Sequence, residues 1–184
     1  MLLIAFGSKC RNGKDTAGEA IRDYYAARRE QVVRHGMIAR TPAVQIVKFA
    51  DALYKEVREL HGMTDKNPKL LQDVGHARRQ ENPNYWIDKA FAGIASWAQI
   101  VLITDLRYQN EAAAVKARGG HNVLVQRVNA DGSPFISDDR PADHPSETDL
   151  DGYNFDHYIR TKNPVLTGEF AVTLAGYLFA LEGK

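Results

Sequence analysis

A short segment near the start of the chain combines glycines with a lysine in a way that suits phosphate binding. Gly7 to Thr16 reads GSKCRNGKDT and follows the apolar run Leu2–Phe6. A buried strand, a tight loop ending in Gly-Lys and then a helix place backbone N–H groups around an anion, and the lysine adds a mobile positive charge. The segment therefore predicts a binding site for a nucleoside triphosphate.

The spacing of this loop departs from the general pattern G-x-x-x-x-G-K-[ST] by one position. Counting back from Gly13, the first glycine should stand where the chain has Ser8, and Gly7 comes one residue too early. An aspartate follows Lys14, so the hydroxyl comes one position later, at Thr16. A Gly-Lys turn that merely caps a helix is the alternative, but the strand and helix context favours a phosphate loop.

Three charged residues follow predicted strands further along the chain. Asp105 ends the apolar run 100–104, where a carboxylate can hold Mg²⁺ or accept a proton, or simply cap a turn. Arg107 could clamp a phosphate with two hydrogen bonds or form a surface ion pair. Arg127 ends a strand before a long loop, from which it could bring positive charge to a group in transfer.

A helical segment downstream offers groups for a second substrate. Arg78 and Arg79 are neighbours on a predicted helix, so only one of them can face a site and hold a phosphate. Tyr85 or Trp86 could stack on a nucleobase, although aromatic residues at helical spacing are more often part of a core. His144, in the run His-Pro-Ser-Glu, could contact a substrate or be hydrogen-bonded in a turn.

The composition limits the classes of protein to which the chain can belong. The chain has 184 residues with 24 basic and 23 acidic side chains, which suits one soluble domain with no global attraction to nucleic acid or membranes. The single cysteine, Cys10, excludes an internal disulfide and fits the reducing cytoplasm. We expect no membrane-spanning segment, because no apolar run has the required length. The histidines have no metal-ligand spacing, so we expect no zinc site.

Strands and helices alternate along the chain. The predicted strands are Leu2–Phe6, Val44–Phe49, Ile100–Asp105, His121–Val128 and Phe155–Ile159. The predicted helices are Lys14–Arg29, Asp51–Val57, Asn67–Gln80, Pro83–Trp97, Asn110–Arg118 and Glu169–Leu181. This alternation predicts an α/β fold with a mostly parallel sheet, whose ligands bind beyond the carboxyl ends of the strands. The loop over about 129–147, rich in Pro, Gly and Asp, is predicted to be a lid or binding loop.

Six stretches in sequence order carry a resemblance over nearly the whole chain. They are Lys9–Thr16, Phe49–Lys55, Leu71–Gly75 with Arg79, Tyr85–Trp86, Thr104–Glu111 and His144–Glu147. Together they resemble the bacteriophage deoxynucleoside monophosphate kinases, and the stretches DLRYQNE and HPSE make the match far more specific than GKDT alone. The resemblance implies a single domain over 1–184 with a three-layer α/β/α P-loop kinase core. It also implies a helical monophosphate-binding region over about 51–98 and a lid over about 129–147.

The resemblance implies transfer of the γ-phosphate of ATP to a deoxynucleoside 5′-monophosphate with Mg²⁺, for phage DNA precursor synthesis in the host cytoplasm. ATP would be bound by Lys9, Arg11, Asn12, Gly13, Lys14, Asp15 and Thr16, and the metal by Thr16 and Asp105. The acceptor would be bound by Asp51, Lys55, Arg79, Trp86, His144 and Glu147. The catalytic residues would be Lys14, Asp105, Arg107 and Arg127.

Two other functions stay open at this point. Similar phage proteins phosphorylate a hydroxymethylated base within DNA, in which case DNA is a partner and Asp105 has to act as a base. The near-zero net charge argues against a polymer groove. A nucleotide-binding protein without turnover is the second alternative, against which the many arginines argue. The sequence does not decide which base is preferred, whether the helices around 67–97 form a homodimer, or what effect Ser8 has in the loop.

Overall fold

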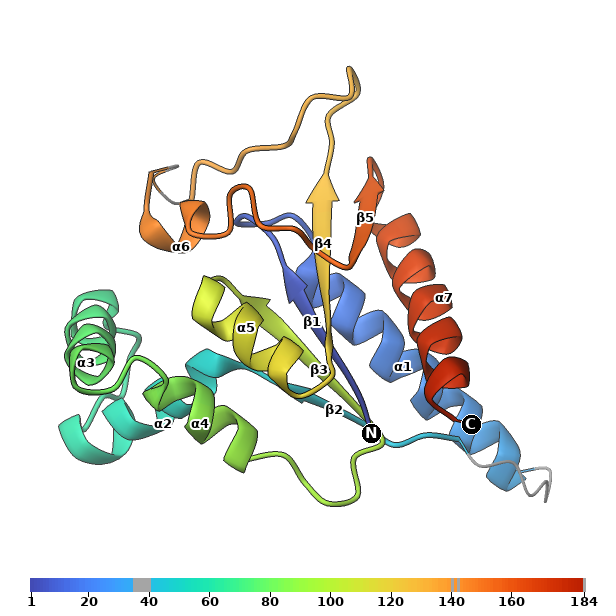
Figure 1. Cartoon of the computed structure of the whole chain (residues 1–184), viewed down its shortest axis with the longest axis horizontal. Coiled ribbons are helices and arrows are strands. Elements are labelled where there is room, and N and C mark those ends of the chain that lie inside the picture. Colours follow the sequence, from blue (N-terminus) through green and yellow to red (C-terminus); the bar gives the residue numbers. More distant parts are fainter. Residues whose placement is uncertain (35–40, 140, 142, 184) are drawn as a thin grey trace.

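A parallel β-sheet forms the centre of the molecule. The structure is a computed structural model and describes residues 1–34, 41–139, 141 and 143–183 (Figure 1). Its strands are β1 (Leu2–Gly7), β2 (Val44–Val47), β3 (Ile100–Leu106), β4 (His121–Arg127) and β5 (His157–Thr161). They lie in the order β2-β3-β1-β4-β5, and every pair is parallel. The predicted α/β class is confirmed, and the sheet is entirely parallel over the described strands.

Helices cover both faces of the sheet. They are α1 (Lys14–Arg34), α2 (Phe49–His61), α3 (Pro68–Glu81), α4 (Tyr85–Ala92), α5 (Gln109–Ala117), α6 (Pro145–Thr148) and α7 (Pro164–Glu182). Figure 1 shows α1 and α7 on one face and α2, α4 and α5 on the other, with α3 packed on α2 and α4 away from the sheet. All six residues of β1 are buried, because the strand lies in the middle of the sheet with helices on either side.

Two apolar clusters fill the spaces between these layers. On one side, Ile4 and Phe6 of β1 pack with Ile21 of α1 and residues of α7. On the other side, Leu3 and Ala5 pack with residues of α2, α4 and α5. Because side chains alternate along a strand, the single strand β1 contributes residues to both apolar clusters. This packing holds the carboxyl end of β1, where the phosphate loop begins, between two rigid packed layers.

Some element boundaries differ from the predicted ones. Phe49, predicted to end a strand, is the first residue of α2. The helix predicted over 83–97 extends only from Tyr85 to Ala92. The side chain of Gln45 on the edge strand explains this end, because its amide donates to the Gly93 carbonyl at 3.0 Å and accepts the Ala95 N–H at 2.8 Å. A tertiary contact thus satisfies the backbone groups beyond the last turn.

Helix α7 corrects the expectation that no apolar segment is long enough to cross a membrane. By length and composition alone, Pro164–Glu182 could do so. In the structure this helix packs along α1 and buries Ala171, Ala175 and Leu178. Core helices of soluble proteins pass the same test, so the helix is weak evidence for a membrane span.

Candidate phosphate-binding site

The loop between β1 and α1 reaches the helix through two residues in left-handed conformations. Arg11 has φ 55° and Gly13 has φ 98°, a conformation that glycine adopts without a steric cost. Gly7 has a different role, because a Cβ there would lie 2.8 Å from Cε1 of Phe155. Ser8 is buried, and its hydroxyl donates to the Lys9 carbonyl at 3.0 Å. The early glycine therefore makes room for an aromatic ring, and Ser8 folds onto its own loop.

Lys14 is a buried cation at the start of α1. Its side chain belongs to a residue only 7% exposed, and within the described part of the chain it has no carboxylate partner. Burial lowers the pKa of Lys14, and the nearby charge of Arg107 lowers it further. The first N–H groups of the helix lack acceptors within the helix itself. A buried charge without a counter-ion is unfavourable, so this end of α1 is suited to an anion.

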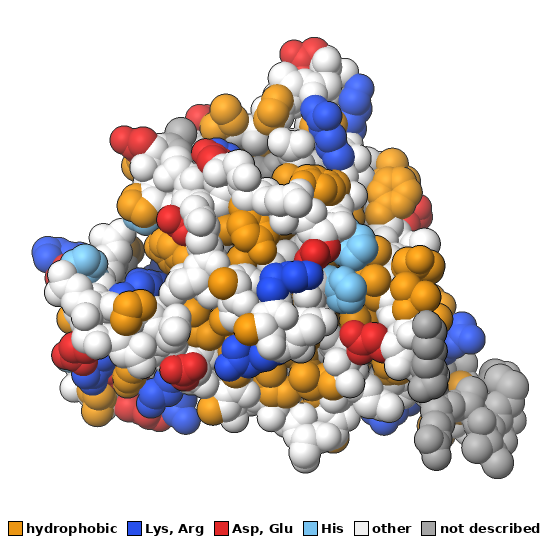
Figure 2. Space-filling model, viewed as in Figure 1, with side chains coloured by type: hydrophobic (Ala, Val, Ile, Leu, Met, Phe, Trp, Pro, Cys, Tyr) orange, Lys and Arg blue, Asp and Glu red, His pale blue; other side chains and the backbone are white. Residues whose placement is uncertain are grey.

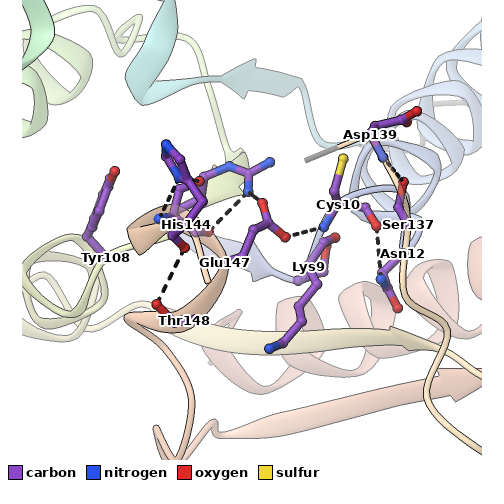
Figure 3. Close-up of polar contacts among 12 residues, drawn as sticks. Lys9, Cys10, Asn12, Tyr108, Ser137, Asp139, His144, Glu147 and Thr148 are labelled. Atoms are coloured by element: carbon purple, nitrogen blue, oxygen red, sulfur yellow. Dashed lines mark hydrogen bonds and ion pairs between the residues drawn. The ribbon is translucent and has the colours of Figure 1, made fainter. Parts of the chain in front are cut away.

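A carboxylate from the far end of the lid lies against the phosphate loop (Figure 3). Glu147, on α6, accepts the Cys10 N–H at 2.6 Å with one oxygen and Nη1 of Arg107 at 2.5 Å with the other. Its side chain is 4% exposed, and that of Arg107 is 17% exposed. Arg107 also donates to the Ser146 carbonyl at 3.2 Å. The loop and Arg107 thus already bind one anion, which the chain itself supplies.

His144 lies beside this carboxylate as the cap of α6. Its Nδ1 accepts the Ser146 N–H at 3.2 Å and lies 2.9 Å from the Ser146 hydroxyl. Figure 3 shows it with Glu147 at the same short helix. The turn hydrogen bond considered from the sequence is present. A role for His144 or Glu147 in binding an acceptor stays a prediction.

Asn12 ties the phosphate loop to β4 and to the lid. Its Oδ1 accepts the Arg127 N–H at 2.8 Å, and its Nδ2 donates to the carbonyls of Cys10 at 3.0 Å and Phe135 at 3.4 Å. Asn12 is 4% exposed. The guanidinium carbon of Arg127 lies 4.3 Å from the centre of the Phe135 ring. Asn12 therefore positions the loop, and Arg127 is held at the base of the lid.

Two further loop cations pair with acidic residues of the lid and the segment after it. Lys9 Nζ lies 3.0 Å from Oδ1 of Asp151, and Arg11 pairs with Asp139. All four side chains are partly exposed to solvent, so these pairs contribute little to stability. They nevertheless connect the loop to the middle of the predicted lid and to the segment that follows it.

Asp105 caps helix α2 from across the sheet edge. Its two oxygens accept the N–H groups of Phe49 and Ala50, each at 2.9 Å. Burial raises the pKa of Asp105, and these two hydrogen bonds oppose the rise. Asp15 is also engaged, because Lys48 Nζ lies 2.7 Å from its Oδ1. Both carboxylates at the carboxyl end of β3 and the start of α1 are thus held by groups of the chain.

The predicted metal ligands do not form a closed cage. Among the residues that the structure describes, no group of three or more His, Cys, Asp and Glu side chains could hold a metal ion. Thr16 is partly buried in the first turn of α1, and Asp105 is held at the carboxyl end of β3 as the cap of α2. Mg²⁺ at phosphate sites takes one or two protein ligands and completes its shell with water and phosphate oxygens. The residues present fit that mode of binding.

The predicted acceptor residues lie in different surroundings. Asp51 and Lys55 line a cavity of about 580 Å³ beside β2. Arg79 lies elsewhere, with its guanidinium carbon 5.1 Å from the centre of the Tyr108 ring and no carboxylate partner among the described residues. The prediction for Trp86 was wrong. It is 2% exposed, and its indole donates to the Gly75 carbonyl at 3.2 Å, so it anchors α4 to α3.

Sequence reasoning missed a buried acid next to the site. Glu111 is 5% exposed, and its Oε2 accepts the N–H groups of Arg107 at 2.8 Å and Tyr108 at 3.1 Å. Burial, together with the nearby charge of Asp105, raises the pKa of Glu111 to about 8. A glutamate three residues after a helix start is a recognised capping signal, which could have indicated this role. By holding both N–H groups, Glu111 fixes the turn that carries Arg107.

Comparisons with known proteins bring little to this geometry. No family model matches the chain, and no curated protein matches it. Among solved structures, the Cys556Ala mutant of the Mycobacterium tuberculosis APS kinase CysC is similar over 95% of this chain and 96% of its own, with a TM-score of 0.45 and 11% identity. A likeness at that level carries no argument about function. The case for a function therefore rests on the site itself.

Proposed function

We propose that the protein is a kinase that transfers the γ-phosphate of ATP to a deoxynucleoside 5′-monophosphate. The observation that carries this proposal is Lys14, a buried cation without a carboxylate partner in the described chain, at the start of a helix that follows a buried parallel strand. Such a helix end with its free N–H groups suits the phosphates of a nucleotide. The resemblance to the phage kinases supplies the acceptor class.

The donor side is assigned to the loop and the first turn of α1. Lys14 and the N–H groups around Gly13 bind the phosphates, while Asn12 holds the loop in shape through β4. Thr16 and Asp105 are the residues that would hold Mg²⁺. When bound, the ion neutralises charge on the phosphate oxygens. Arg127, without a carboxylate partner among the described residues, is available at the base of the lid to meet the transferring group.

The acceptor side is assigned to Arg107 and Arg79. A monophosphate oxygen is already anionic, so its attack needs positioning and positive charge rather than a strong base. This agrees with Asp105, whose two oxygens accept backbone N–H groups of α2. A neutral hydroxyl on a DNA base would instead require a carboxylate free to take a proton. The arrangement thus favours the monophosphate over the DNA acceptor.

The lid contacts indicate how the site exchanges anions. Glu147 occupies the Cys10 N–H and the Arg107 guanidinium, two groups that suit a phosphate. An arriving phosphate competes with this carboxylate for both of them. We expect Glu147 and α6 to move as substrates bind, which excludes water from the transfer point and limits ATP hydrolysis.

The experiment that tests the function measures ADP release with each of the four deoxynucleoside monophosphates, with hydroxymethylated DNA and with no acceptor. The proposal expects release that depends on a monophosphate and falls by about 10²- to 10³-fold in Lys14→Ala. Release that depends only on DNA would support the base kinase, and ATP binding without any release would support a non-catalytic nucleotide-binding protein. A fully active Lys14→Ala variant would overturn the proposed site.

A further inference from the structure

A second cavity adjoins the phosphate loop on the α5 side of the sheet. It has a volume of about 370 Å³, within the range of small-molecule sites. Its apolar wall consists of Leu124, Phe135, Ile136, Leu150, Tyr153 and Phe155. Ser8, Lys9 and Asn12 of the loop close it on one side, together with Arg107. An apolar chamber thus opens directly beside cations of the proposed transfer point.

One polar side chain lines this chamber without a hydrogen bond to another described residue. Gln126 lines the cavity at the end of β4, two positions after Leu124 and therefore on the same face of the strand. Within the described chain its amide makes no hydrogen bond, whereas the amide of Gln45 makes two. A side-chain amide presents one acceptor and two donors, so it can pair with the polar edge of a flat heterocycle.

The cavity lining combines charged groups with aromatic rings. Arg107 pairs with Glu147 at the end of the lid, and Lys9 pairs with Asp151 in the segment after it. The rings of Tyr153 and Phe155, whose centres are 4.9 Å apart, also line the cavity. A ligand that suits this lining has an anionic group and an aromatic ring.

We propose that this cavity binds the nucleobase of the acceptor nucleotide, with Gln126 as the residue that reads its edge. The inference rests on the proposed function and deepens it. The base lies among Leu150, Tyr153 and Phe155, and the 5′-phosphate points toward Arg107. Gly7 belongs to this site indirectly, because its missing side chain allows Phe155 to form the wall.

A first experiment measures kcat/KM for the four deoxynucleoside monophosphates in Gln126→Glu. The substitution keeps the acceptor oxygen and removes the donor, so it should change the ranking of the four bases by about tenfold for at least one pair. Gln99→Glu is the matched control, because Gln99 is exposed just before β3, at the amino end of the strands, and among the described residues its side chain only accepts the Ala43 N–H. If Gln126 has only a structural role, the substitution should change kcat/KM by the same factor for all four monophosphates. That result would overturn the inference.

A second experiment fills the chamber and measures nucleoside binding to the whole protein by calorimetry. Leu150→Trp should weaken binding of deoxynucleosides by about tenfold or more while ATP binding is kept, since tryptophan takes the space of the base. Leu181→Trp, on the exposed side of α7, should leave both unchanged. Where Leu150→Trp also loses ATP binding, the fold is damaged and the Gln126→Glu ranking decides.

The outcomes separate this inference from the proposed function. If the protein phosphorylates monophosphates but Gln126→Glu leaves the base ranking unchanged and Leu150→Trp leaves nucleoside binding unchanged, the cavity inference alone is overturned. If Leu150→Trp removes nucleoside binding but the natural chain transfers no phosphate, the proposed kinase function is overturned. The cavity then remains a binding site for nucleosides. Loss of ATP binding in Leu150→Trp with deoxynucleoside binding kept would place the donor's base in the chamber and overturn the inference.

Discussion

Two regions of this molecule each bury a glutamate, and they treat its charge in opposite ways. In the helical region formed by α2, α3 and α4, Glu56 is 7% exposed and accepts Tyr85 Oη at 2.6 Å and Arg78 Nε at 2.8 Å. At the carboxyl edge of the sheet, Glu111 is 5% exposed, and its hydrogen bonds within the described chain come from backbone N–H groups alone. Burial acts to raise the pKa of both acids. The hydrogen bonds of Tyr85 and Arg78 reverse the direction for Glu56.

Neighbouring arginines repeat the contrast. Arg78 pairs with Glu56 and Glu81, whereas Arg79 turns to the Tyr108 ring and meets no carboxylate among the described residues. In the helical region, Arg78 and Glu56 thus neutralise each other. Arg79 belongs to the same helix α3 but reaches the sheet edge at Tyr108, where Lys14 and Arg127 also have no carboxylate partner among the described residues. Cations left without a counter-charge are typical of a site that binds an anion.

The largest effect we expect comes from the buried cation of the sheet edge. Lys14→Ala should lower kcat for phosphate transfer by about 10²- to 10³-fold, because one charged donor at the transfer point is lost. The folded chain should be no less stable, since the substitution removes a buried charge without a counter-ion. Steady-state kinetics and Tm measure the two effects. Lys69→Ala, an exposed lysine paired with Asp73, is the control and should change neither.

The next effect is a loss of stability as pH rises, caused by Glu111. Its pKa of about 8 lies above the ordinary 4.5, so the folded chain keeps a proton that the unfolded chain releases. The stabilisation is complete below about pH 4.5 and is lost as pH rises through about 8, with an upper bound of roughly 5 kcal/mol. Urea unfolding across this range should show the slope, and Glu111→Gln should flatten it.

Glu56 should make stability depend on pH in the opposite direction to Glu111. Its pKa lies below the ordinary 4.5, so its contribution is present above that pH and is lost as pH falls through the folded value. Glu56→Gln should therefore alter the acid limb of the stability profile and leave the alkaline limb unchanged. Identical profiles for the two glutamine variants would show that the two regions do not differ in this way.

A smaller effect is expected at the tie between the loop and β4. Asn12→Ala leaves the partly buried Arg127 N–H without its acceptor and should destabilise the fold by about 1–3 kcal/mol. Because the loop is also released from β4 and the lid, KM for ATP should rise. Asn129→Ala, exposed at the start of the lid, is the control, as its side-chain hydrogen bonds among the described residues stay within the turn at 129–134. An unchanged KM for ATP would show that Asn12 acts only on stability.

The neighbouring arginines provide the smallest and most specific comparison. Arg79→Ala should raise KM for the monophosphate by about tenfold through a lost charge-assisted hydrogen bond, with little change in Tm. Arg78→Ala should do the reverse, lowering Tm by several degrees because Glu56 loses its partner, with KM for the monophosphate nearly unchanged. Equal effects on KM would refute the division of roles between the two regions.

Sequence reasoning found the strands of the sheet and the strand, loop and helix around Gly13 because these depend on local patterns. The continuous apolar runs at 2–6 and 100–104 became the central strands β1 and β3. The predictions from the sequence were wrong where a residue distant in the chain decides where a helix ends or a side chain packs. The helix predicted to reach Trp97 ends at Ala92 beside Gln45, and Trp86 is buried against α3 instead of facing a substrate. No local spacing encodes those contacts.

The phosphate loop shows most clearly what each level determined. The sequence by itself determined a strand, a loop ending in Gly-Lys and a helix, because burial pattern and glycine conformation are properties of neighbouring residues. Only the tertiary structure showed that Gly7 makes room for Phe155, that Asp105 caps α2 and that Glu147 lies on the Cys10 N–H. These roles depend on which buried groups meet across the sheet edge, and folding alone brings them together.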